Sequence, residues 1–327
     1  MADKKEIILQ TNNLKKYFTV RNFFGTSKNY IKAVDGITFD IKKGEAFGLV
    51  GESGCGKSTL GRTLIRMYEP TDGTLIFDGD DITHKKKKEL LPYHKRMQII
   101  FQDPYSALDP HQNVREIMDE PLRMYSTLGK QERYDLIENL LEKVGLQKDA
   151  LEKYAYEFSG GQRQRIGIAR ALSVNPEFIM CDEPISALDV SIQAQVVNLL
   201  EDLQEEFGLT YLFVSHDLSM VRHISNRIGV MYLGNIVEIA DNDELYDRPL
   251  HPYTQALLSA IPIADPLKAR ATQRKVITGD LPSPLNIPSG CRFHTRCPYA
   301  TERCKTESPV LKDVGGGHQV ACHLMDA

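Results

Sequence analysis

The chain has 327 residues, of which 42% are hydrophobic and 26% are charged, so it is long enough for a substantial core and for two domains. A formal net charge of −4 gives no electrostatic reason to expect a nucleic-acid partner. No window approaches the roughly 18 apolar residues of a membrane span, and the start lacks a secretory signal. We therefore expect a cytosolic chain that reaches a membrane only through a partner.

The first predicted elements are strands that lead into a phosphate-binding loop. Strands are predicted around residues 7–9 and 36–41, and residues 45–50 form a short apolar run typical of a buried strand. Residues 51–59 then fill every position of the GxxxxGK[ST] phosphate loop, and residues 59–67 are predicted to be helical. Strand, loop and helix in this order are the context that a true phosphate loop requires.

The composition of this loop explains how it would bind a nucleoside triphosphate. Its glycines allow a tight turn that aims backbone N–H groups at phosphate oxygens, helped by the positive end of the following helix. Lys57 is expected on the β- and γ-phosphates, and Ser58 on Mg²⁺. The predicted nucleotide-binding set is Gly51, Ser53, Gly54, Cys55, Gly56, Lys57, Ser58 and Thr59.

The middle of the chain is predicted to be mostly helical, from about residue 103 to residue 175. Apolar residues at helical spacing between Tyr134 and Val144 lie on one predicted helix face, which ends at Gly145, a suitable C-terminal cap. The basic run at residues 84–88 is flanked by acidic residues, and we interpret it as a solvated loop or helix face without a function.

An apolar run at residues 178–181 ends in two carboxylates, as a buried parallel strand would end at the ligand edge of its sheet. Asp182 can hold Mg²⁺ directly or through water. Glu183 points elsewhere, so it is the candidate to orient and deprotonate the attacking water. Alone, the pair could also be a strand end followed by the acidic first turn of a helix. A helical stripe at residues 192–207 and a strand at 211–215 follow, which predicts an α/β nucleotide-binding fold.

The composition changes near Pro249, since nine of the sixteen prolines lie between Pro249 and Pro309. Four of the six cysteines follow in the same tail, and disulfides are not expected in a cytosolic chain, so the thiols indicate a metal centre. These thiols belong to Cys291, Cys297, Cys304 and Cys322. The spacing is not that of a CxxC zinc ribbon, but zinc remains an alternative because His294, His318 and His323 lie nearby in sequence. Free buried cysteines without a metal are the other alternative.

The phosphate loop, the acidic pair and the segment 158–162 (Phe-Ser-Gly-Gly-Gln) together resemble an ABC ATPase. The resemblance implies that Gln102 is the loop glutamine that touches Mg²⁺ and the lytic water, and that His216 contacts the γ-phosphate. It implies that Asp189 lies in the loop that senses the partner domain. Tyr17 is expected to stack on adenine, with Phe18 as the rival.

The same resemblance implies that Ser159, Gly160, Gly161 and Gln162 form the signature, which closes over the ATP held by a partner domain. A complete site then needs two nucleotide domains head to tail. Because this chain carries one such domain, we expect it to work as a dimer.

Residues 248–258, with a His-Pro-Tyr triplet at 251–253, look like the C-terminal extension of peptide-importer ATPases, and the resemblance runs from residue 14 to residue 323. The loop and residues 101–105 are most similar to the F-type subunit. That subunit implies a paralogous D-type partner in a heterodimer, two transmembrane permease subunits and an extracytoplasmic peptide-binding protein. The tail resembles those that carry a [4Fe–4S] cluster, expected here as a structural staple.

We therefore predict an ABC ATPase domain at residues 1–248, with its helical subdomain at about 103–175, and a C-terminal extension at 249–327. The predicted function is to hydrolyse ATP and drive the import of di- or oligopeptides from the cytoplasmic face of the membrane. The alternatives are a soluble ABC ATPase acting on ribosomes or DNA, an importer of nickel or glutathione, and a P-loop kinase.

Overall fold

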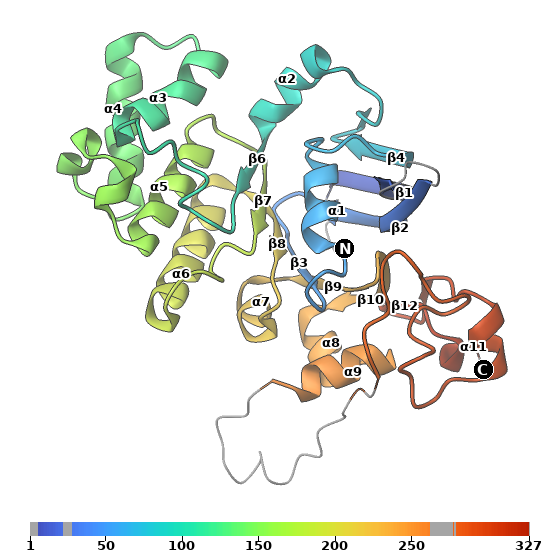
Figure 1. Ribbon diagram of the computed structural model, residues 1–327. Coiled ribbons are helices and arrows are strands. Elements are labelled where there is room, and N and C mark those ends of the chain that lie inside the picture. Colours follow the sequence, from blue (N-terminus) through green and yellow to red (C-terminus); the bar gives the residue numbers. More distant parts are fainter. Residues whose placement is uncertain (1–5, 22–27, 262–276, 278, 327) are drawn as a thin grey trace, which may run out of the picture. The chain divides into compact units, whose positions relative to one another are not determined.

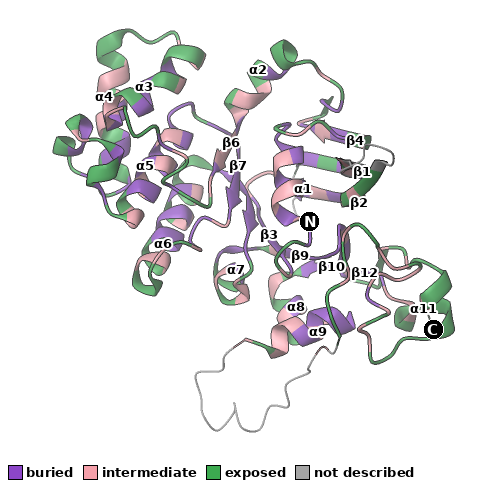
Figure 2. Ribbon diagram, in the orientation of Figure 1, coloured by how far each residue is buried: buried purple, intermediate pink, exposed green. Residues whose placement is uncertain are grey.

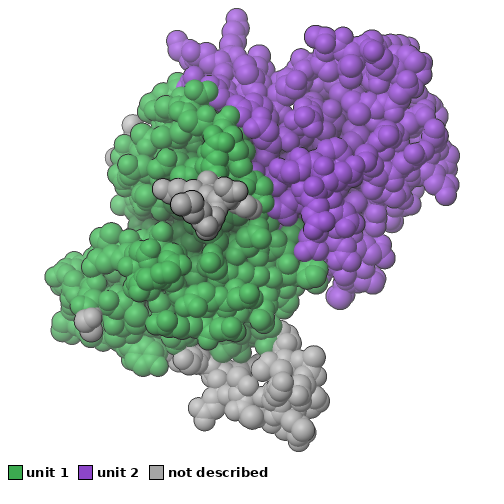
Figure 3. All heavy atoms as spheres, turned by 180° about the vertical axis from the view of Figure 1, so that it is seen from behind, with its two compact units in different colours: residues 1–84, 215–327 green, residues 85–214 purple. Residues whose placement is uncertain are grey.

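The computed structural model describes residues 6–21, 28–261, 277 and 279–326, so the predicted lack of a signal at the start concerns residues mostly outside this range (Figure 1). The chain divides into two compact units (Figure 3). The first contains residues 1–84 and 215–327, and the second contains residues 85–214. Among the described residues, no helix is long and apolar enough to cross a bilayer.

The first unit contains a four-stranded antiparallel sheet in the order β2-β1-β4-β5. Its strands are β1 (Ile7–Arg21), β2 (Lys28–Lys42), β4 (Asp72–Phe77) and β5 (Asp80–Asp81). Alternating apolar residues such as Leu9, Ile37 and Ile41 are fully buried. The two predicted strands are confirmed, but both are longer than expected, because mutual pairing continues through residues in which apolar and polar side chains do not alternate regularly.

A second group of strands in this unit leads to the phosphate loop. The wholly buried strand β3 (Ala46–Val50) runs parallel to β9 (Arg227–Tyr232), which pairs antiparallel with β10 (Asn235–Asp241). The C-terminal extension continues the sheet, since β12 (Gln319–Val320) pairs with β10 and with β11 (Lys312–Asp313). The extension is thus hydrogen-bonded to the nucleotide-binding part of the unit.

Six helical segments complete the described part of the first unit. They are α1 (Lys57–Leu64), α7 (Leu218–Ile224), α8 (Asn242–Asp247), α9 (Pro252–Ser259), α11 (Glu302–Thr306) and the 3₁₀ turn η3 (His323–Met325). The predicted helix at 59–67 is confirmed as α1. It ends earlier than expected because Arg66 has a left-handed backbone with φ of 59°.

The second unit contains three parallel strands and a group of helices. The strands β6 (Met97–Ile100), β7 (Phe178–Asp182) and β8 (Thr210–Val214) pair in the order β6-β7-β8, and β7 and β8 are wholly buried (Figure 2). The helical segments are α2 (Lys87–Arg96), α3 (Val114–Tyr125), α4 (Lys130–Lys143), η1 (Lys148–Glu152), η2 (Ala155–Glu157), α5 (Gly160–Leu172) and α6 (Val190–Phe207).

The helix ends in this unit follow the glycines, as the sequence indicates. Ile137, Leu140 and Leu141 bury one face of α4, and Gly145 beyond it has φ of 75°. α6 ends at Gly208, which adopts a left-handed conformation with φ of 64°. The basic run at 84–88 is mostly exposed around the start of α2, as its interpretation as a solvated face requires.

Candidate functional site

The phosphate loop connects β3 to α1, and two of its glycines are fixed by close backbone approach. A Cβ on Gly51, which has φ of 153°, would lie 2.2 Å from the carbonyl oxygen of Met231. A Cβ on Gly56, with φ of 108°, would lie 2.1 Å from the carbonyl oxygen of Ala33. Any other residue at either position would displace the loop from β9 or β2.

The side chain of Lys57 curls back into this loop and is buried, with 4% exposure. Its Nζ donates to the carbonyl oxygens of Gly51, at 2.8 Å, and Glu52, at 3.2 Å. Ser53 and Gly54 are exposed at the crest of the loop, and Ser58 is half-buried at the start of α1. An ammonium group at the centre of a glycine-rich loop before a helix N-terminus suits a phosphate anion.

Cys55 has a packing role in this loop. Its side chain is buried, and burial raises the pKa of the thiol, so the group is protonated at neutral pH. Gly234 donates its N–H to the carbonyl oxygen of Cys55 at 2.7 Å. Cys55 therefore anchors the loop as a small apolar residue.

Tyr17, the predicted adenine-stacking residue, lies on β1 with a half-buried side chain. Its hydroxyl donates to Asp35, which also accepts from Arg292 Nη2 at 2.5 Å. Burial and the bond to Asp35 raise the pKa of Tyr17. No local pattern in the sequence marks Asp35 or Arg292 as neighbours of Tyr17. Phe18, the rival, packs edge-on against Tyr68 at 5.4 Å between centroids.

His216 is exposed in the segment before α7. The next residue, Asp217, caps α7 by accepting from the N–H groups of Ser219 and Met220. Asp217 in turn donates its own N–H to the hydroxyl of Ser215 at 3.0 Å. The segment carrying His216 is therefore fixed on its C-terminal side by a helix cap.

In the second unit, the structure brings together two residues predicted to act on the lytic water. Gln102 Nε2 donates to Glu183 Oε2 at 3.1 Å. Glu183 follows β7 with a left-handed φ of 47°, and its N–H donates to the carbonyl oxygen of Val214 at 3.0 Å. A left-handed backbone is uncommon outside glycine, so this conformation is held by its surroundings. The turn separates the carboxylate of Glu183 from that of the preceding residue, Asp182.

Asp182 ends β7 and is fully buried. Within the second unit, its carboxylate and the exposed Gln102 amide carry oxygen ligands of the kind that Mg²⁺ prefers. In the first unit, the half-buried Ser58 hydroxyl is a ligand of the same kind. The donor types at these three positions therefore fit Mg²⁺.

The signature begins α5. The Ser159 hydroxyl accepts from Gln162 N–H at 3.4 Å, and the Gln162 side chain accepts from Ser159 N–H at 3.0 Å, which forms a capping box. A Cβ on Gly161 would lie 2.5 Å from Ile192 Cγ2 of α6, so this glycine also allows α5 to pack closely. Ser159 and Gln162 remain exposed, and Asp189 is exposed at the N-cap of α6.

The four tail cysteines gather in one part of the extension, each half-buried with a free thiol. Cys291 N–H donates to the carbonyl oxygen of Cys304 at 2.8 Å. Burial, together with the three other thiols, raises the pKa of Cys322 to about 11, although the Leu324 N–H opposes the shift. Within the described ranges, no three His, Cys, Asp or Glu side chains are grouped to hold a single metal ion.

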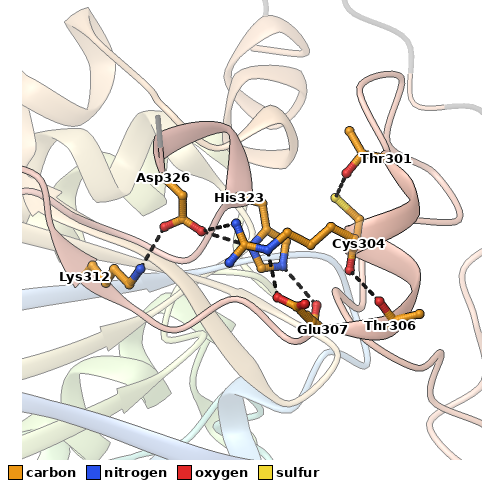
Figure 4. Close-up of polar contacts among 8 residues, drawn as sticks. Thr301, Cys304, Thr306, Glu307, Lys312, His323 and Asp326 are labelled. Atoms are coloured by element: carbon orange, nitrogen blue, oxygen red, sulfur yellow. Dashed lines mark hydrogen bonds and ion pairs between the residues drawn. The ribbon is translucent and has the colours of Figure 1, made fainter.

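Of the three histidines that kept zinc open as an alternative, His294 lies beside a tail cysteine, with its Nδ1 2.8 Å from the carbonyl oxygen of Cys291, and the other two bond carboxylates and a backbone carbonyl of the first unit. Figure 4 shows His323 between Asp326 and Glu307, and its nitrogens lie 3.1 Å from Asp326 Oδ2 and 3.0 Å from the Glu307 carbonyl oxygen. His318 bonds Glu238 at 2.8 Å and Glu244 at 3.4 Å. His318 and His323 are therefore parts of polar networks of the extension.

Comparison with known proteins identifies two family regions in the chain. The ABC transporter family matches residues 34–186, and the C-terminal region of oligopeptide/dipeptide transporters matches residues 237–304. The chain is 54% identical over 325 residues to the oligopeptide transport ATP-binding protein AppF of Bacillus subtilis, covering 99% of both. It is 55% identical over 318 residues to the putative oligopeptide transport ATP-binding protein YkfD of the same species, covering 97% of this chain and 95% of the relative.

Among solved structures, the chain resembles a dimeric post-hydrolysis state of the ATP-binding cassette MJ0796 bound to ADP and Pi. The TM-score is 0.64 and the identity 28%, over 72% of this chain and 99% of the cassette. The cassette CbiO1 of Clostridium perfringens gives the same TM-score at 26% identity, over 75% of this chain and 92% of that protein. These structural similarities confirm the predicted fold class, an α/β nucleotide-binding fold of the ABC ATPase type.

Proposed function

The chain belongs to the ATP-binding proteins of ABC-type oligopeptide and dipeptide transporters, and we propose the roles that its residues play in that activity. It is an ATPase subunit that energises peptide import. The assignment rests on one observation: in this chain, a region that matches the ABC transporter family is followed by a region that matches the C-terminal region of oligopeptide/dipeptide transporters. The names of the relatives give no support to an action on ribosomes or DNA.

The phosphate end of ATP would lie in the loop 51–59. Lys57 would bind the β- and γ-phosphates, because its ammonium group is already buried at the centre of the loop. The adenine would stack on the Tyr17 ring, whose hydroxyl bond to Asp35 fixes the ring position. Ser58, Gln102 and Asp182 would hold Mg²⁺, which when bound would neutralise negative charge on the phosphates.

Hydrolysis would depend on Glu183, which accepts a proton from water as the water oxygen bonds to the γ-phosphorus. The bond from that phosphorus to the bridging oxygen breaks, which gives ADP and phosphate. Gln102 would orient the carboxylate and the water, which the 3.1 Å bond to Glu183 supports. His216 would donate to a γ-phosphate oxygen.

The signature would act on the ATP of a partner domain. Ser159, Gly160, Gly161 and Gln162 begin α5, and Ser159 and Gln162 are exposed, which leaves the helix N-terminus accessible to a second chain. Asp189 would sense that partner. We propose a D-type paralogue as the second chain, so that ATP closes a heterodimer and hydrolysis reopens it.

The assembly would also contain two transmembrane permease subunits, and indirectly a peptide-binding protein on the far side of the membrane. The chain would lie at the cytoplasmic face as a peripheral subunit. We divide it into the ATPase domain, residues 1–248, and the extension, residues 249–327; the match to the C-terminal region of oligopeptide/dipeptide transporters begins earlier, at residue 237.

We further propose that Cys291, Cys297, Cys304 and Cys322 hold a [4Fe–4S] cluster. The four half-buried thiols of the extension could offer one thiolate to each iron of such a cluster, which is the chemistry that supports the proposal. The engagement of His318 and His323 in other bonds weighs against zinc. The cluster would supply a structural crosslink in the tail.

Affinity purification of the Glu183→Gln chain from membranes in mild detergent tests this function. Recovery of two multi-spanning proteins and a paralogous ATPase is the expected result. Recovery of ribosomal or DNA-associated proteins in their place would overturn the transport assignment.

A further inference from the structure

The C-terminal extension forms hydrogen bonds with the phosphate loop at Glu52. Arg296 donates from Nη1 to Glu52 Oε2 at 2.9 Å and from Nη2 to Glu52 Oε1 at 3.1 Å. The backbone N–H of Glu52 donates to the hydroxyl of Tyr253 at 2.9 Å. Both the side chain and the backbone of Glu52 are thus held by residues of the extension, although position 52 is one that the phosphate-loop pattern leaves unspecified.

The environment of Arg296 makes this ion pair strong. Its side chain is 9% exposed, and its guanidinium lies 6.0 Å from the ring centroid of Tyr232. The hydrogen bonds to Glu52 raise the pKa of Arg296, so the group stays charged. Bidentate bonds between a planar guanidinium and a carboxylate fix orientation as well as distance. Loss of either partner would leave a charge in a largely desolvated site.

The His-Pro-Tyr triplet explains how the Tyr253 hydroxyl reaches the loop. His251 caps α9 by accepting from Tyr253 N–H at 3.1 Å, and Pro252 occupies the first position of the helix. Tyr253 is fully buried, and its ring centroid lies 4.7 Å from that of Tyr232 and 5.4 Å from that of Phe293. The cap at the start of α9 and the packing of the ring in the aromatic cluster together fix the position of the Tyr253 hydroxyl, which accepts from the Glu52 N–H.

The extension also reaches the end of the site that carries Tyr17. Arg292 donates to Asp35, the acceptor of the Tyr17 hydroxyl, and also to the carbonyl oxygen of Leu233. Arg292 and Arg296 lie on the same short segment and flank Phe293, which is buried in the aromatic cluster. One segment of the extension thus supports both predicted ends of the nucleotide site within the first unit.

We infer that Arg296 and Tyr253 are positioning residues for ATP binding, acting through Glu52 on the curvature of the phosphate loop. Because Tyr253 takes the Glu52 N–H, the phosphates are left to N–H groups further along the loop. A loop held in this shape loses less conformational freedom when ATP binds. The inference rests on the proposed binding of ATP at residues 51–59, and it makes the extension a determinant of ATP affinity.

The test compares full-length variants by titration with ATP and by ATPase kinetics of the assembled transporter. Arg296→Gln removes the charge, and Tyr253→Phe removes only the hydroxyl while keeping the buried ring. Each is expected to raise the Kd for ATP, and the KM, about five-fold or more, with kcat changing by less than about two-fold. Arg303→Gln is the matched control, because this arginine pairs with Glu307 at 2.7 Å and Asp326 at 2.9 Å. It should leave the Kd unchanged.

A second pair of variants separates positioning from general destabilisation. Glu52→Gln should weaken ATP binding to a similar degree. The double variant, Glu52→Gln with Arg296→Gln, should bind ATP no more weakly than either single variant. Wild-type Kd values in both Arg296→Gln and Tyr253→Phe, or additive effects in the double variant, would overturn the inference. If Arg296→Gln fails to fold, Tyr253→Phe still decides the question.

The control for the proposed site itself is Lys57→Ala. If Lys57→Ala loses ATP binding while Arg296→Gln and Tyr253→Phe bind ATP as the wild type does, the positioning role is refuted and the phosphate loop remains the ATP site. Equal ATP binding by the wild type and Lys57→Ala would contradict the assignment of the phosphate loop, whatever the extension does.

Discussion

Gln102 donates a hydrogen bond to Glu183 across 3.1 Å, and the two residues lie on segments that follow neighbouring parallel strands, β6 and β7. Parallel strands end at the same edge of their sheet, so residues 81 positions apart meet there. The carboxylate that we propose as the proton acceptor is therefore oriented by an amide that cannot itself take a proton.

Replacing Glu183 by Gln should lower kcat at least about 100-fold while ATP still binds, because the water loses its base and the phosphate cradle remains. The variant should accumulate as a closed dimer with ATP, measurable by light scattering. Glu205→Gln, at an exposed position of α6, is the control. Near-normal turnover by the Glu183 variant would remove this residue from the role of base.

Replacing Gln102 by Ala should lower kcat by about ten-fold, less than the loss of the base, because Glu183 keeps its proton-accepting group but loses the bond that orients it. Steady-state ATPase assays of the assembled transporter measure the change. A kcat equal to that of the wild type would show that the bond has no part in turnover.

Gly161→Ala should destabilise the second unit by about 1–2 kcal/mol, because the new Cβ would lie 2.5 Å from Ile192 Cγ2. Thermal unfolding checks the loss, and adding Ile192→Ala should recover much of it by removing the clashing methyl group. Gly167→Ala, on the same helix, is the control, since nothing lies within 4 Å of a Cβ there. Equal stability of the two single variants would contradict the packing argument.

His251 makes the extension sensitive to acid. Burial lowers the pKa of His251 from 6.5 to about 4, so between these values the unfolded chain binds a proton that the folded chain does not. Stability should fall as the pH drops from 6.5 to 4, by up to about 3 kcal/mol, and the Nδ1 acceptor of the α9 cap is lost on protonation. His251→Asn keeps a capping acceptor without this titration. Its unfolding midpoint should depend less on pH, and an unchanged dependence would assign the acid sensitivity elsewhere.

Cys297→Ser should remove the proposed cluster and loosen the tail more than the nucleotide site. Iron and acid-labile sulfide in the anaerobically purified chain measure the first effect, and limited proteolysis measures the second. Because burial raises the pKa of the Cys297 thiol, a proton must leave when metal binds, and loading should improve as the pH rises. Cys181→Ala should keep its iron, and the same iron content in Cys297→Ser would refute this ligand.

The sequence predicts the elements around the nucleotide well because their signals are local. The loop 51–59, the apolar run into Asp182 and the glycines after α4 and α6 each depend on neighbouring residues only. The contacts of Arg296 with Glu52 and of Arg292 with Asp35 join positions 244 and 257 residues apart, and no local periodicity marks them. The full length of the pairing of β1 with β2 escapes sequence reasoning for a related reason, since apolar and polar residues do not alternate regularly in its outer half.

If ATP hydrolysis by this chain drives peptide import, a reconstituted transporter that contains it should take up peptide. Proteoliposomes would hold the transporter purified with this chain, with ATP on the side of the ATPase subunits and a labelled oligopeptide mixture with binding protein on the other. We expect ATP-dependent peptide accumulation that is lost with Lys57→Ala. ATP hydrolysis without accumulation of any peptide, or accumulation that is equal without ATP, would show that this chain does not drive peptide import.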